Sequence, residues 1–136
     1  MLRYAAGYLT TAVVFLALDA VWLTQMAERL YRPHIGALMA DKPNLPAAVA
    51  FYLIYIAAVL GLAILPALRP DGGWQRLLTS AALFGFAAYA TYDLTNQATL
   101  KTWSTVVTVA DMAWGAFVTT AAASAGYFVA SRLGGR

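Results

Sequence analysis

Three aspartates stand in or at the ends of long apolar stretches of this sequence: Asp19, Asp93 and Asp111. A carboxylate at the centre of a membrane helix costs about 2.5–3.5 kcal/mol on insertion scales, so such residues usually face the protein interior and often mark function. A carboxyl group beside tyrosines can exchange protons with them or with a bound molecule. The first question is therefore whether the fold brings the three together.

Aromatic and amide side chains accompany these aspartates at short spacing. Asp19 and Asp111 share an Asp-x-x-Trp pattern, and Asp93 stands in the run Tyr-Asp-Leu-Thr-Asn. The candidates for binding a ligand or a proton are Asp19, Trp22, Tyr89, Tyr92, Asp93, Asn96, Asp111 and Trp114. The sequence assigns no catalytic residue and leaves open whether the protein is an enzyme.

The composition is typical of an integral membrane protein. Of the 136 residues, 62% are hydrophobic and 11% are charged, whereas a soluble domain carries about 25% charged residues. The absence of cysteine excludes disulfides and thiol chemistry. The basic residues form no patch of the kind that binds nucleic acid, so no nucleic-acid partner is expected.

Four segments are long and apolar enough to cross a bilayer as helices, at about 4–26, 46–68, 74–96 and 104–131. They predict an all-α fold, a four-helix transmembrane bundle in a single domain over residues 1–136. The longest connection lies between the first two helices. The first segment contains Asp19 and lacks a small-x-small cleavage site, so we interpret it as a retained helix rather than a signal peptide.

This topology places the three aspartates at one depth. Asp19 lies seven residues before the expected end of the first helix, and Asp111 lies seven residues after Ser104. Both positions are about 10 Å inside their helix ends at 1.5 Å per residue. Asp93 closes the third helix on the same side, so the carboxyl groups are expected to share one leaflet.

Helical periodicity predicts which residues accompany each aspartate on its face. The stripe on the first helix is Tyr8, Ala12, Phe15, Asp19, Trp22 and Met26. The stripe on the third is Thr79, Ala82, Phe86, Tyr89, Asp93 and Asn96. The stripe on the fourth is Thr108, Asp111, Gly115, Thr119, Ala122 and Gly126, whose small residues allow another helix to approach closely.

A purely structural role for the aspartates is the main alternative. Asp93 can cap the fourth helix or pair with Lys101, and Asp19 can hydrogen-bond to a tyrosine or tryptophan. The only histidine, His34, has no second ligand at metal-binding spacing, so no metal is expected. No cofactor is indicated.

The runs Tyr92-Asp93-Leu94-Thr95-Asn96 and Asp111-Met-Ala-Trp114-Gly115 resemble a known family. This family consists of predicted bacterial membrane proteins grouped as domain of unknown function 2177. Further similarity covers Asp19 to Trp22, Tyr31, His34-Ile-Gly36 and Phe51-Tyr52. The resemblance implies a small multi-pass protein of the bacterial inner membrane and implies no activity. Five basic residues on the side of the termini against four on the other favour cytoplasmic termini.

Three functions fit these observations. The first is binding of an amphipathic or lipid-like ligand at an intramembrane pocket with acidic and aromatic walls. The second is proton-coupled transport of a small molecule by a homo-oligomer. The third is a non-catalytic accessory subunit of the membrane. The expected partners are the lipid bilayer, a lipid-like ligand and a second copy of the chain.

Overall fold

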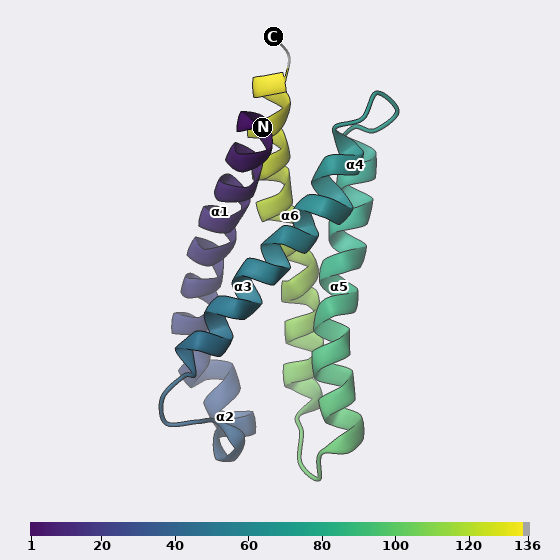
Figure 1. The fold of residues 1–136 in the computed structure, drawn as a ribbon. Helices are drawn as coiled ribbons and strands as arrows, with labels where there is room; N and C mark the ends of the chain where they lie inside the picture. Colours follow the sequence, from purple (N-terminus) through teal and green to yellow (C-terminus); the bar gives the residue numbers. More distant parts are fainter. Residues whose placement is uncertain (135–136) are drawn as a thin grey trace.

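The computed structural model describes residues 1–134, and this part of the chain is all-helical, as predicted. Four long helical segments run up and down (Figure 1). The first comprises α1 (Leu2–Met26), a π-helix (Ala27–Tyr31), α2 (Arg32–Ile35) and a 3₁₀-helix (Gly36–Leu38). The second comprises α3 (Leu45–Val59), a π-helix (Leu60–Ile64) and α4 (Leu65–Ala67). The third is α5 (Trp74–Thr99) and the fourth is α6 (Thr105–Gly134).

The long helix α6 organises the others. It packs along both α1 and α5, and α3 crosses obliquely over them (Figure 1). The N-terminus, the α4–α5 turn and the end of α6 lie at one end of the molecule, which we call the terminal end. The region around α2 and the α5–α6 connection lie at the other, which we call the α2 end.

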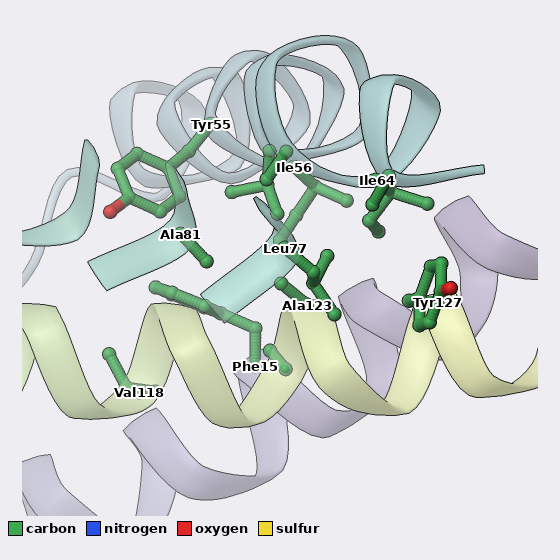
Figure 2. Packing of buried hydrophobic residues seen from close by; sticks show 13 residues of the cluster. Phe15, Tyr55, Ile56, Ile64, Leu77, Ala81, Val118, Ala123 and Tyr127 are labelled. Atoms are coloured by element: carbon green, nitrogen blue, oxygen red, sulfur yellow. The ribbon is translucent and has the colours of Figure 1, made fainter. Parts of the chain in front are cut away.

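A closely packed apolar core extends from the terminal end to the middle of the molecule. Figure 2 shows Tyr55, Ile56 and Ile64 pointing from the second segment toward the other helices. The cluster that they form includes Phe15, Leu77, Ala81, Val118, Ala123 and Tyr127, all buried. In a membrane such side chains leave lipid rather than water, so close van der Waals packing between the helices stabilises the cluster.

Small residues set the close approach of α6 to its neighbours. All six residues of the stripe predicted on this helix are buried, which confirms that face: Thr108, Asp111, Gly115, Thr119, Ala122 and Gly126. A Cβ atom added at Gly126 would collide with Thr11 and the Gly7 carbonyl of α1. A Cβ atom added at Gly85 of α5 would collide with the Gly115 carbonyl and Thr119.

The stripe predicted on α5 is wrong in part. Asp93 is buried and Tyr89 is partly buried, but Thr79 and Phe86 are exposed. The buried face runs instead through Leu77, Ala81 and Gly85. The physical reason is that α6 lies so close at Gly85 that no side chain fits between the helices there, which leaves Phe86 on the outside.

The longer connection predicted between the first two helices is mostly helical. Helical structure continues through the π-helix and α2 to Leu38, and only residues 39–44 lack it. Each π-helix in the described chain ends two residues before a proline, Pro33 or Pro66. Proline has no N–H to donate to the preceding turn, so the backbone ahead of it can adopt the wider hydrogen-bonding pattern.

A side-chain cap and a glycine turn mark the starts of α3 and α5. The Asn44 side chain caps α3, because its Oδ1 accepts a hydrogen bond from the Ala47 N–H at 3.1 Å, with Pro46 in the first turn. The tight turn before α5 ends at Gly73, whose φ of 108° is a conformation that favours glycine.

Three of the four segments are long and apolar enough to cross a membrane: Leu2–Leu38, Leu45–Ala67 and Thr105–Gly134. At about 1.5 Å per residue even the shortest covers a hydrocarbon core of roughly 30 Å. Helix α5 has 26 residues but is less apolar, because Arg76 and the polar run after Tyr89 lie within it.

Candidate functional site

The three aspartates come from three helices and are all buried near the α2 end. Asp19 of α1 is 7% exposed, Asp93 of α5 is 0% exposed and Asp111 of α6 is 4% exposed. Within residues 1–134 none of them forms an ion pair. The two ion pairs found there join Arg32 to Glu28 and Arg76 to Asp71. The cost of burying these carboxyl groups must therefore be offset by hydrogen bonds or by protons.

Asp19 receives two hydrogen bonds from neighbouring helices. The Tyr52 hydroxyl of α3 donates to Oδ2 at 2.5 Å, and the Trp114 indole N–H of α6 donates to Oδ1 at 3.3 Å. Each oxygen thus has a donor. This aspartate ties α1 to both α3 and α6.

Asp111 is held by a relay of two aromatic groups. The Tyr31 hydroxyl donates to Asp111 Oδ1 at 2.5 Å, and the Trp22 indole N–H donates to the Tyr31 oxygen at 2.7 Å. Tyr31 therefore accepts and donates at once, and it connects the continuation of the first helix to α6.

The two Asp-x-x-Trp patterns meet across the α1–α6 contact. The rings of Trp22 and Trp114 stack with centroids 4.4 Å apart and planes 9° from parallel. Trp114 of α6 hydrogen-bonds directly to Asp19 of α1, and Trp22 of α1 is connected to Asp111 of α6 through Tyr31. The arrangement is reciprocal, because each helix contributes one acid and one indole.

Asp93 differs from the other two. Its carboxyl group lies against that of Asp111, and neither Asp93 oxygen receives a hydrogen bond from a described residue. The cap and the Lys101 ion pair considered for Asp93 are both absent from residues 1–134, and Ser104 instead accepts the Val107 N–H at the start of α6. A buried carboxylate without a donor is costly. A proton held by one of the two acids would supply the missing donor.

A pocket of about 390 Å³ opens beside this network. Its lining comes from all four helical segments and consists of Asp19, Trp22, Leu23, Tyr31, Phe51, Tyr55, Ala88, Tyr89, Tyr92, Asp111 and Trp114. Leu23, Phe51 and Tyr92 are about half exposed, so they form the rim where the pocket reaches the protein surface. The walls are therefore mainly aromatic, with two carboxyl groups inside.

Glycine at position 115 makes room for one pocket wall. A Cβ atom added there would collide with the Tyr89 side chain, which packs across the α6 backbone at this point. The Tyr89 ring also lies edge-on to Tyr55, with centroids 6.4 Å apart. The close contact of α5 and α6 thus fixes where Tyr89 stands.

The chain matches one known protein family along most of its length. Residues 4–128 match the family model described as "Predicted membrane protein (DUF2177)". The chain belongs to this family. The match confirms the resemblance carried by the Tyr-Asp-Leu-Thr-Asn and Asp-x-x-Trp runs, and the family is one of membrane proteins. No curated protein and no solved structure matches the chain significantly.

Six of the eight residues that the sequence singled out line the pocket of this DUF2177 chain: Asp19, Trp22, Tyr89, Tyr92, Asp111 and Trp114. Asp93 lies next to Asp111 and does not line the pocket. Asn96 lies outside it as well, near the end of α5, and its side chain makes no hydrogen bond within residues 1–134.

The candidate site residues did not include Tyr31, Phe51, Tyr52 or Tyr55, although the first three lie in the stretches that resemble the family. Tyr31 stood beyond the expected end of the first helix. In an unbroken α-helix, nine residues at about 100° each would put it on the face opposite Trp22. The π-helix takes up extra chain and changes that register, so Tyr31 reaches the Trp22 side.

His34 lies outside the pocket lining, and its Nδ1 hydrogen-bonds with the Leu30 carbonyl oxygen at 2.7 Å. Among the described residues no three histidine, aspartate or glutamate side chains are grouped so as to hold a metal ion. The chemistry available in the pocket is therefore that of carboxyl groups, phenols and indoles.

Proposed function

We propose that this protein spans the bacterial inner membrane four times and binds an amphipathic, lipid-like ligand in the pocket beside Asp19 and Asp111. Four up-and-down helical segments support this topology. Helix α5 is included because it is long enough and its buried aspartate faces other helices rather than lipid. Both termini then lie on one side, which the distribution of arginines favours as the cytoplasmic side.

One observation carries the proposal: the pocket combines an apolar rim with polar groups deeper inside. In a bilayer, a rim of Leu23, Phe51 and Tyr92 would face acyl chains rather than water. A ligand with an apolar body could enter from the membrane and place a polar head near the carboxyl groups. Ligand sites of about 300–1,000 Å³ with mostly apolar walls and few polar groups are typical of small-molecule binding.

The topology is tested with single cysteines in this cysteine-free chain. Cysteines at Gly73 and at Asp41 should react with a membrane-impermeant maleimide from opposite sides of sealed vesicles. Labelling of both from the same side would contradict four spans and the shared depth of the carboxyl groups.

The binding site is tested by filling the pocket. Ala88 lines it and Ala87 of the same helix is exposed. Ala88→Phe should weaken binding of a fluorescent amphiphile at least about tenfold, measured by energy transfer from the protein's tryptophans. Ala87→Phe is the matched control and should bind normally. Equal binding by both variants would contradict the assigned site.

Proton-coupled transport by a homo-oligomer is a second candidate. The adjacent Asp93 and Asp111 favour it, since two acids sharing a proton can release it when a substrate binds. Uptake of the amphiphile by vesicles that depends on a pH gradient would support this candidate. Binding without such uptake would leave the binding protein as the better description, and no binding at all would favour the accessory role.

A further inference from the structure

The charged side chains in and beside the pocket indicate what kind of ligand head group it accepts. Two acids line it, and a third, Asp93, is buried next to Asp111 without lining the pocket. No lysine, arginine or histidine is among the lining residues. Neither ion pair in the described chain involves these acids. A positive charge is therefore missing from a site that holds three carboxyl groups.

Three donors of the pocket lining are already used within the protein, whereas the hydroxyls of Tyr89 and Tyr92 make no hydrogen bond within residues 1–134. The hydroxyl of Tyr31 and the indole N–H groups of Trp22 and Trp114 all donate within the protein. An acceptor remains unfilled in the pocket lining, because only Oδ1 of Asp111 receives a hydrogen bond within residues 1–134. A ligand that brings N–H donors would complete this arrangement.

The pocket walls also suit a cation. Seven of the eleven lining residues are aromatic: Trp22, Tyr31, Phe51, Tyr55, Tyr89, Tyr92 and Trp114. The faces of such rings attract ammonium groups, by about 2 kcal/mol or more where water is excluded. Phe51 and Tyr55 stand side by side at 5.2 Å, and Tyr55 meets Tyr89 edge-on, so the rings are inclined around a common space.

We infer that the ligand is an amphipathic ammonium compound, a protonated amine with an apolar body. Its N–H groups would face the Asp111 carboxyl group, and its apolar body would lie against the aromatic walls toward the rim. This inference rests on the proposed function and specifies its ligand class.

Three fluorescent probes with one apolar body test the inference on the detergent-purified full chain. Dansylcadaverine carries an ammonium group at neutral pH, its N-acetyl derivative is uncharged, and dansyl-6-aminohexanoate is an anion. Energy transfer from tryptophan reports the binding of each. The cation should bind at least about tenfold more tightly than the neutral probe, and the anion should bind most weakly.

The failures of the two proposals are distinguishable. Equal or tighter binding of the neutral probe or the anion would overturn the ammonium class and leave the pocket's ligand-binding role standing. No binding of any probe by protein that elutes as a single folded species would overturn both. These outcomes need no variant, so they do not depend on whether a substitution folds.

Variants then locate the charge preference. The cation would displace the proton that Asp93 and Asp111 hold between them, which only the intact pair allows, so Asp93→Asn and Asp111→Asn should each reduce the ratio of cation to neutral affinity at least about threefold. Asp41→Asn removes a carboxylate from an exposed position outside the pocket and should leave the ratio unchanged. A ratio that all three variants lower equally would assign the preference to the net charge of the protein, which contradicts the inference.

Discussion

The two ends of this protein use the same helices for opposite purposes. At the terminal end, α1 and α6 touch through Gly7, Thr11 and Gly126 beside the apolar core, and the hollows at this end lie outside that core, around Arg3 and Arg69. At the α2 end, the same two helices meet through Asp19, Asp111 and two stacked indoles, beside a pocket of about 390 Å³. Close packing at one end fixes the helix axes, so the other end can keep an open space without collapsing.

The largest effect is expected where the packing is closest. Gly126→Leu should prevent stable folding, because even a Cβ atom there would collide with Thr11 and the Gly7 carbonyl. Overpacking of a filled core costs about 1–3 kcal/mol or more, and here backbone must move. Thermal unfolding in detergent, followed by gel filtration, measures the loss.

The matched control is Gly61→Leu. Nothing lies within 4 Å of a Cβ atom added at Gly61, so this variant should be as stable as the parent. If both leucine variants are equally stable, the terminal end is not the rigid part of the molecule.

Gly115→Leu should produce the next largest effect, and it should change both the helix packing and the pocket. The added side chain would displace Tyr89, which both packs on α6 and lines the pocket. We expect a loss of about 1–3 kcal/mol in stability together with loss of probe binding. Ala113→Leu, at an exposed position of the same helix, should be silent in both measurements. Silence of Gly115→Leu would mean that Tyr89 can move without consequence.

Tyr31→Phe should lower the free energy of unfolding more than the loss of a hydroxyl at the terminal end does. It removes a hydroxyl that serves both Trp22 and Asp111, and a buried group left without its partner costs about 1–3 kcal/mol. Thr11→Val should cost less than about 1 kcal/mol, because the Thr11 hydroxyl donates only to the Gly7 carbonyl of its own helix. Unfolding free energies that rank the two variants in the reverse order would contradict the contrast drawn between the ends.

The sequence predicted how far along each helix the aspartates lie. It was less informative about which face of each helix is buried and where the helical register changes. The apolar lengths and the short α5–α6 connection were enough to predict an all-α fold with the three aspartates near one end. The buried face of α5 was wrong at Phe86, because the closeness of α6 is a tertiary property that periodicity does not contain. Tyr31 was missed because its position depends on a π-helix, which Pro33 permits but does not by itself specify.

The smallest structural change tests the most specific feature of the α2 end, the Asp93–Asp111 pair. Neither Asp93 oxygen has a donor, so we expect one proton to be held between the two acids at neutral pH. Infrared spectra of the purified protein at pH 7 should then show a protonated-carboxyl band. Asp93→Asn and Asp111→Asn should each abolish the band, because each removes one of the two acids that hold the proton.

Stability should hardly change in these two variants. An asparagine amide can donate to the remaining carboxylate as the shared proton did, and in Asp111→Asn the amide oxygen can still accept from Tyr31, so we expect differences within about 1 kcal/mol. Asp19→Asn should keep the infrared band, since both Asp19 oxygens already accept hydrogen bonds from Tyr52 and Trp114. A parent spectrum without the band would mean that both acids are ionised side by side. The α2 end would then need a bound cation even at rest, and the shared proton would be ruled out.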